Sequence, residues 1–563
     1  MRRARWMAAL LACSGAAARA EKPPPDPVLA AMQAEVARAQ GLSLGELDRP
    51  YYVSAAVNRS STLAIAASFG ALVSARDQSW ASTEVKVRVG SPALDDTNFR
   101  DTDFALEFRQ WFSPYRAPVE LDPDALRQTL WLRLDDAYKV AVERIAHKRA
   151  FLQTKRVEAL PPDFSAARLE PRVLPPQQPA VEQARWTSLV RKASALFRDS
   201  AADEASVRFV SSVERRWFVS SDGALDRFDL PSVELTIQAS AQAPDGMEVQ
   251  AGAEWSGRGE GDLPRDEAVV AEAQRVRDRI GQLVAAPVMK EEYSGPVLFT
   301  GRAAAIFFLK TLGEPLSGPR RPLGAQDRGR LTDRLEKHIA SKIFTVRDDP
   351  TQERFKGKAL LGAFPVDDEG VVPVPLLLVQ DGVLKTYFMS RTPTAAIAAS
   401  NGHCRGGRGA PGNLFVEAAH GISRARLKQA LVEMAKDEDL KYGLLVEDFQ
   451  SGRGSWRDGG GEGGFFDSSS SGGVRLPVPS VVYRVSPDGK EELVRGVRLK
   501  GLPVRALKDV VAVGADPAVV NARSQGERVS IVAPAVLVKD VETERPNPEQ
   551  DIPPQLPRPV VAR

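Results

Sequence analysis

The alternation of apolar and polar positions predicts strands and long helices in the first half of the chain. Short strands are expected at residues 51–57, 62–68, 70–74 and 82–89, and the last of them alternates apolar and charged residues. Asp122 followed by Pro123 is typical of a helix start. An apolar stripe from Leu126 to Ile145 then predicts one long helix that ends near Thr154.

The pattern continues with helices at 181–200 and 266–284 around strands at 206–213, 216–220, 232–239 and 247–255, after a Pro-rich linker or surface crossing at 161–179. The second half is richer in strands, at 296–300, 440–448, 480–486, 490–499 and 528–539, with helices at 303–313, 328–342 and 424–437. We therefore predict an α+β fold with two large domains, 46–290 and 291–543. The first has a mixed sheet with long helices, and the second is β-rich.

The ends of the chain indicate export and flexible flanks. Residues 1–20 have a basic start, a short apolar run and a small-residue cleavage site, which predicts a signal peptide and a periplasmic protein. Leu10–Cys13 also resembles a lipobox, so a lipid anchor on Cys13 stays open as an alternative. We interpret 21–45 as a spacer, 451–473 as a flexible Gly/Ser-rich loop and 544–563 as a Pro-rich tail.

Charge and cysteine content exclude some kinds of site. The formal net charge is +3, of which Arg2, Arg3, Arg5 and Arg19 contribute +4. Cleavage of the signal peptide would remove these four charges, so the net charge of the mature chain is 3 − 4, or about −1. The sequence has no clustered basic patch, so we expect no nucleic-acid partner. Only Cys13 and Cys404 are present, which excludes an intrachain disulfide after cleavage and a cysteine-based zinc cluster.

The candidate chemistry lies between residues 301 and 415. The acidic run Asp367, Asp368 and Glu369 could supply general acid and base catalysis if burial separated the pKa values. The same run followed by Gly370 is typical of a solvated turn, which is the interpretation we favour. The glycine-rich loop beyond it carries His403 and Cys404 as further candidate residues.

The order of several segments resembles the TldD/PmbA family of metallopeptidases. The match extends over residues 296–516. It rests on Pro296–Gly318, Asp348–Thr351, Gly362–Gly370, Asp381–Lys385, Met389–Arg391, Ser400–His403, Asn413–Val416 and Leu507–Asp516. The resemblance implies a two-domain architecture and, in catalytic relatives, a zinc ion held by His-Glu-x-x-x-His and a later Cys.

This chain departs from that family pattern at the metal-binding positions. The matching residues are Leu309, Lys310 and Glu314, and no cysteine follows Cys404. Leucine cannot bind zinc, and lysine is neither a carboxylate base nor a common zinc ligand. We therefore expect no catalytic residue and no bound metal at this site. A zinc site relocated to Glu314, His338, His403 and Cys404 stays open as an alternative.

These features predict an exported, metallopeptidase-related protein that is a non-catalytic subunit or pseudoenzyme. The resemblance implies that it binds unfolded peptide, pairs with a zinc-bearing relative or forms a homo-oligomer. Two alternatives remain, namely an active peptidase with a non-standard metal site and a cell-envelope scaffold or binding protein.

Overall fold

A computed structural model describes residues 26–100, 115–155, 160–317, 320, 322–323, 331, 333–450 and 474–544. The predicted signal peptide with Cys13, the loop 451–473 and the tail from residue 545 onward lie outside the described residues. None of the helices in the described ranges combines the length and the apolar composition needed to span a bilayer.

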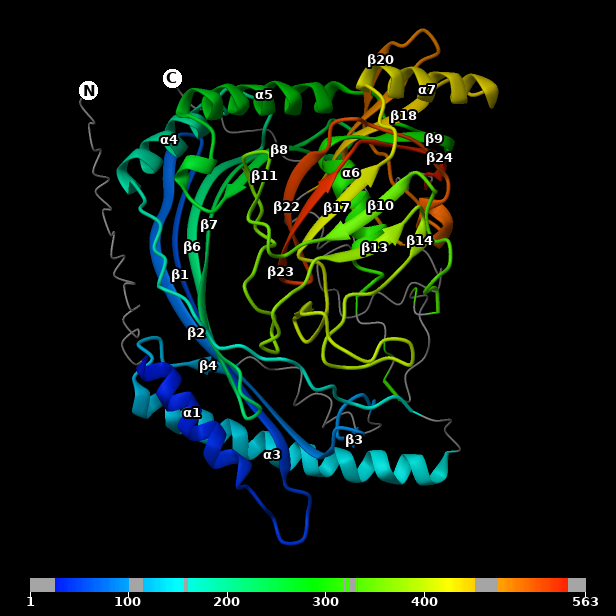
Figure 1. Ribbon diagram of the computed structural model, residues 1–563. Helices are drawn as coiled ribbons and strands as arrows, with labels where there is room; N and C mark the ends of the chain where they lie inside the picture. The colour runs from blue at the N-terminus through cyan, green and yellow to red at the C-terminus, as the bar shows by residue number, and fades with distance from the viewer. Residues whose placement is uncertain are drawn as a thin grey trace, which may run out of the picture.

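The N-terminal half is built on one long, curved sheet (Figure 1). Its strand order is β3-β2-β1-β6-β7-β5, with β4 beside β2 and β8 beside β7, and only the β5–β7 pair is parallel. The strands are β1 Pro50–Ser68, β2 Ala71–Ser91, β3 Leu94–Asp95, β4 Tyr115–Ala117, β5 Arg172–Val173, β6 Glu204–Ser220, β7 Leu225–Gln242 and β8 Glu248–Gly257.

Two of these strands are much longer than the sequence pattern predicted. The four short strands expected between residues 51 and 89 are two long ones, β1 and β2, paired almost without interruption. The polar run Asn58–Ser61 suggested a break, but it continues β1 between the two apolar ends. Backbone pairing to both neighbouring strands compensates for the lack of apolar side chains there.

Helices pack on one face of this sheet and form two separate apolar cores. The helices are α1 Pro27–Gln40, α3 Pro123–Thr154, α4 Gln183–Ala195 and α5 Asp266–Ala285, with the short 3-10 helix η1 at Glu260–Asp262. One core joins α1 and α3 to β1 and β2, and the other joins α4 and α5 to β6, β7 and β8. The Asp122 side chain caps α3 as predicted. In contrast, α1 lies inside the range that we interpreted as a spacer.

The C-terminal half consists of two six-stranded sheets with α6 Gly301–Phe308 packed in their shared core. One sheet has the order β14-β13-β10-β17-β23-β22 and the other β20-β19-β18-β9-β24-β21. The strands are β9 Ser294–Phe299, β10 Phe344–Asp348, β13 Leu376–Gln380, β14 Val383–Leu384, β17 Asn413–Ala418, β18 Gly443–Phe449, β19 Pro479–Val485, β20 Glu491–Val494, β21 Val510–Val513, β22 Ala518–Ser524, β23 Glu527–Ala533 and β24 Val536–Glu542.

Smaller elements complete this half. They are the hairpins β11 Arg354–Phe355 with β12 Lys358–Ala359 and β15 Cys404–Arg405 with β16 Arg408–Gly409, the π-helical turn η2 Leu309–Gly313, helix α7 Arg424–Asp437 and the 3-10 helix η4 Val504–Leu507. The predicted helix at 328–342 is wrong for its described part, because residues 333–342 form turns and a bridge between His338 and Val383. The α+β class and the β-rich second half are confirmed.

Figure 1 shows β1, β2, β6 and β7 curving around the C-terminal sheets. The two halves meet where Arg216 of β6 forms an ion pair with Asp368 at 2.7 Å. Nearby, Gly370 lies close to Phe218 and Ala224 of the N-terminal half. The acidic run singled out from the sequence is therefore part of the contact between domains.

Candidate functional site

Helix α6 carries the positions that match the zinc motif. It follows β9 directly, and its residues from Ala303 to Phe308 are all buried, as expected for a helix between two sheets. The helix then widens into the π-helical turn η2, in which the amide of Glu314 donates to the carbonyl of Leu309 at 2.9 Å. The π turn therefore joins the backbone of positions 309 and 314, which are five residues apart.

Two of the three motif positions form an ion pair, and the third is an apolar core residue. Leu309 is buried in the apolar core at 1% exposure. The ammonium nitrogen of Lys310 lies 2.8 Å from Oε1 of Glu314, and the Ser524 hydroxyl of β22 donates to the same oxygen at 2.9 Å. The single carboxylate of the motif is therefore already engaged by a positive charge and a hydroxyl group.

These residues do not fit a zinc ion of the family kind. Leucine offers no donor atom, and the Lys310 ammonium would repel a divalent cation beside Glu314. Within the described ranges, no group of three or more His, Cys, Asp or Glu side chains is arranged to hold a metal.

The relocated donor set is not brought together either. Glu314 directly follows η2, and exposed His338 makes a backbone bridge to Val383. His403 is fully buried, with Nε2 3.2 Å from Asp348 Oδ1 and Nδ1 2.9 Å from the carbonyl of Asn401. Because both ring nitrogens are engaged with protein oxygens, this histidine links its own loop to the end of β10 and has no nitrogen left for a metal.

The acidic run forms the predicted turn, but it is not solvated. Gly370 has a φ of +77°, and its amide donates to the Asp367 carbonyl at 3.2 Å. Asp367 and Glu369 are only 1% and 6% exposed. The expectation of a solvated turn is therefore wrong, because the N-terminal sheet covers this turn.

Asp367 is the carboxylate that organises the turn. Its Oδ1 accepts from the amides of Glu369 and Val371 at 2.9 Å, and its Oδ2 accepts from the amide of Cys404 at 3.0 Å. Burial, followed by the neighbouring Glu369 carboxylate, raises the pKa of Asp367 to about 8. Burial and then Glu369 also raise the pKa of the Cys404 thiol, which is an unreactive state for a cysteine.

The other two acids connect the turn to its surroundings. Asp368 binds the Arg216 guanidinium at 2.7 Å and accepts from the amide of Gly406 at 2.7 Å. Glu369 accepts from the backbone amide of Arg391 at 2.6 Å. All three acids thus have structural partners, and the thiol beside them, Cys404, is buried with a raised pKa, which disfavours its action as a nucleophile.

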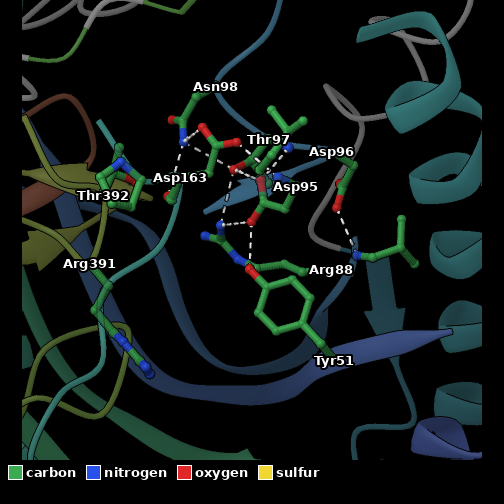
Figure 2. A network of polar contacts seen from close by, with 12 residues as sticks. Tyr51, Arg88, Asp95, Asp96, Thr97, Asn98, Asp163, Arg391 and Thr392 are labelled. Carbon is green, nitrogen blue, oxygen red and sulfur yellow. Dashed lines mark hydrogen bonds and ion pairs between the residues drawn. The ribbon is translucent and has the colours of Figure 1, made fainter. Parts of the chain in front are cut away.

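Asp163 lies in the segment that we interpreted as a linker or surface crossing. Its role as the centre of a buried polar network was not predicted from the sequence. Asp163 is 1% exposed and binds Lys148 and Arg320, the latter at 2.7 Å. It also accepts from the amide of Asp95 at 2.9 Å. Figure 2 shows Asp163 beside Asp95, which in turn binds Arg88 at 2.8 Å and the Tyr51 hydroxyl at 2.6 Å.

The next residue, Phe164, joins this network to the C-terminal half. The guanidinium carbons of Arg88 and Arg391 lie 4.1 and 4.0 Å from the centroid of its ring. Arg391 also donates to the carbonyl of Ser165 at 3.0 Å and pairs with Asp222 at 2.7 Å. This arrangement is a cation–π contact between the two halves of the chain.

One sequence signal could have revealed this network. Lys148 falls three residues after Ile145, on the same stripe as Leu134, Tyr138 and Ala141. A lysine at a core position requires a buried acceptor. Its ammonium group is fully buried and binds the carbonyls of Asp95 and Thr97 as well as Asp163.

Residues 291–545 match the PmbA/TldA metallopeptidase C-terminal domain. A metalloprotease of Methanothermobacter thermautotrophicus is 24% identical over 351 residues, which cover 61% of this chain and 68% of the relative. The C-terminal half of the chain belongs to the TldD/PmbA family.

Solved structures share the fold over nearly the whole chain. TldE from Thermococcus kodakarensis superimposes with a TM-score of 0.58 at 14% identity, covering 91% of this chain and 99% of that one. A Thermotoga maritima protein described as a candidate modulator of DNA gyrase has a TM-score of 0.56 at 15% identity, covering 88% and 96%. At these identities the likeness shows the fold of a TldD/PmbA protein.

Proposed function

We propose that this TldD/PmbA protein is an exported, non-catalytic subunit that pairs with a zinc-bearing relative and helps to bind unfolded peptide. One observation carries the proposal. The chain has the fold of the family, while a lysine–glutamate ion pair occupies the motif positions around the π turn. A framework kept without its ligands supports a role in assembly or binding.

The buried junction supports the same proposal. The acidic turn, the Asp163 network and the contact of Phe164 with Arg391 fix the two halves in one arrangement. A subunit that encloses a substrate needs such a rigid frame even if it supplies no chemistry. Extended peptide would then bind through backbone hydrogen bonds at a sheet edge.

An active peptidase with a non-standard metal site has less support. Glu314, His338 and the adjacent His403 and Cys404 lie in three separate segments and bind separate partners. A cell-envelope scaffold remains the second candidate, because the frame described above would serve it equally well.

The deciding experiment is purification of the tagged full chain from its native host, followed by identification of the proteins that accompany it. We expect a second TldD/PmbA protein that carries His-Glu-x-x-x-His. Repeated recovery of the chain alone would remove the partnership, and an envelope protein that is not a peptidase would favour the scaffold. The mass of the mature N-terminus tests export, because cleavage after Ala20 and lipid attachment at Cys13 give different masses.

A further inference from the structure

The outer half of β2 is an open sheet edge. Residues 71–80 are exposed throughout, apart from the partly buried Ser74. β1 pairs with one side of this segment. Among the described residues, β4 and β3 pair with the other side of β2 only from Ala81 onward.

This edge has two features with opposite effects on association. Val73 and Trp80 are 67% and 53% exposed, which leaves apolar surface beside unpaired backbone groups. A β-bulge lies near Val73, since the register with β1 shifts between Ala66 and Ala67. The bulge limits the regular edge to Ser74–Trp80, and Arg76 and Asp77 lie at its centre.

The position of these charges disfavours pairing with a second copy. A strand forms antiparallel hydrogen bonds through alternate residues, so a two-fold axis must place one residue opposite its own copy. The register that uses all of Ser74–Trp80 places Asp77 opposite Asp77. A shift by one residue places Arg76 opposite Arg76, and like charges directly opposite are destabilising. The opposite shift, centred on Gln78, gives a shorter overlap because β4 occupies the edge beyond Trp80.

We infer that Ser74–Trp80 is the docking edge for a strand of a non-identical partner that places an acidic residue opposite Arg76 and a basic residue opposite Asp77. Such a strand would convert both unfavourable pairs into favourable ones and would cover Trp80. The charges of Arg76 and Asp77 and the bulge near Val73 would then disfavour pairing with a second copy of this chain and favour one complementary partner. This inference rests on the proposed function for the identity of the partner, but the edge itself can be tested without that partner.

A charge-swapped version of the chain supplies a complementary strand. In Arg76→Asp/Asp77→Arg, both central charges are reversed, so a mixture with the unswapped chain places opposite charges together in either long register. Ala75→Cys in the unswapped chain and Ser79→Cys in the swapped chain place two thiols opposite each other in the longest register. Cys404 is fully buried, and a Cys13→Ser background removes the other thiol.

Under mild oxidation we expect about five- to tenfold more disulfide-linked dimer in the mixture than in controls that carry the same cysteines without the charge swap. Equal cross-linking of the unswapped controls would show that a second copy occupies the edge. Absence of cross-linking in every sample would show that this edge does not pair at all. Either result would overturn the inference.

The outcomes also separate this inference from the proposed function. If no cross-link forms but the chain still co-purifies with a zinc-bearing relative, the assignment of Ser74–Trp80 as the docking edge is wrong and the proposed partnership is supported. If the mixture cross-links but no relative co-purifies, the edge stands and the identity of the partner is wrong. The four substituted positions of β2 are exposed, so circular dichroism should show an unchanged fold.

Discussion

The ammonium nitrogen of Lys310 lies 2.8 Å from Oε1 of Glu314, across the π turn that ends α6. Both side chains are largely covered, at 26% and 19% exposure. The Ser524 hydroxyl completes the surroundings of the carboxylate. The pair therefore joins the central helix to β22 and replaces a metal-binding arrangement with an electrically neutral one.

Replacing Lys310 by methionine should destabilise the protein by about 1–2 kcal/mol, because the largely buried Glu314 side chain would lose its cationic partner. The free energy of unfolding in urea measures this change. The double variant Lys310→Met/Glu314→Gln should recover most of the loss, since neither partner is then charged. A coupling energy near zero in that double-mutant cycle would show that the two residues act independently.

Restoring the family motif should restore an affinity for zinc. In Leu309→His/Lys310→Glu/Glu314→His, two imidazoles would lie five residues apart across the π turn, and zinc content after dialysis should rise towards about one ion per chain. Without the later cysteine ligand, the affinity should be modest. The control Leu309→Ala/Lys310→Glu/Glu314→Ala should take up no zinc at this site. Stoichiometric zinc in the unsubstituted chain would contradict our interpretation of the motif.

Gly370→Ala should be strongly destabilising. Gly370 has a φ of +77°, and a Cβ there would lie 2.7 Å from the Cβ of Ala224 and 3.1 Å from Phe218. The strained backbone and the overlap together should cost about 2–4 kcal/mol. Gly357→Ala is a matched control, because its φ is +82° and a Cβ there meets nothing within 4 Å. It should cost only about 1 kcal/mol, and equal losses would show that the domain contact is looser than described.

The elements with strong periodicity could be predicted from the sequence. The long helix α3 begins after Asp122 and ends at Thr154 as expected, because one stripe and one capping residue determine both ends. The turn at Gly370 also followed from its residue types. Its burial did not, because the covering strands come from a distant part of the chain.

The geometry of the candidate site was harder to predict from the sequence. The motif positions could be matched by letters, but the pairing of Lys310 with Glu314 depends on a π turn that no local pattern indicates. The Asp163 network depends on contacts between segments far apart in sequence. Only Lys148, a charged residue on an apolar stripe, gave a local hint of it.

Asp226 should make the protein less stable as the pH rises. It is fully buried at the domain junction, its Oδ1 accepts from the amide of Arg172 at 3.2 Å, and burial raises its pKa to about 7. The unfolded chain loses this proton near pH 3.9, whereas the folded chain keeps it until about pH 7. Between these values the folded state binds more protons, so the free energy of unfolding falls by up to about 1.4 kcal/mol per pH unit.

Asp226→Asn separates this contribution from those of Asp96 and Asp367, whose pKa values are raised to about 7 and about 8, in each case mainly by burial. The amide keeps an oxygen for the Arg172 backbone and cannot ionise. Urea unfolding between about pH 5 and pH 8 should therefore show a shallower decline for the variant, which should be the more stable protein at the upper end. We attribute the pH dependence of the unfolding free energy that remains in the variant to Asp96 and Asp367. Parallel declines for the two proteins would mean that Asp226 is already ionised in the fold, with Arg216, the cation that lowers its pKa most, as its counter-charge.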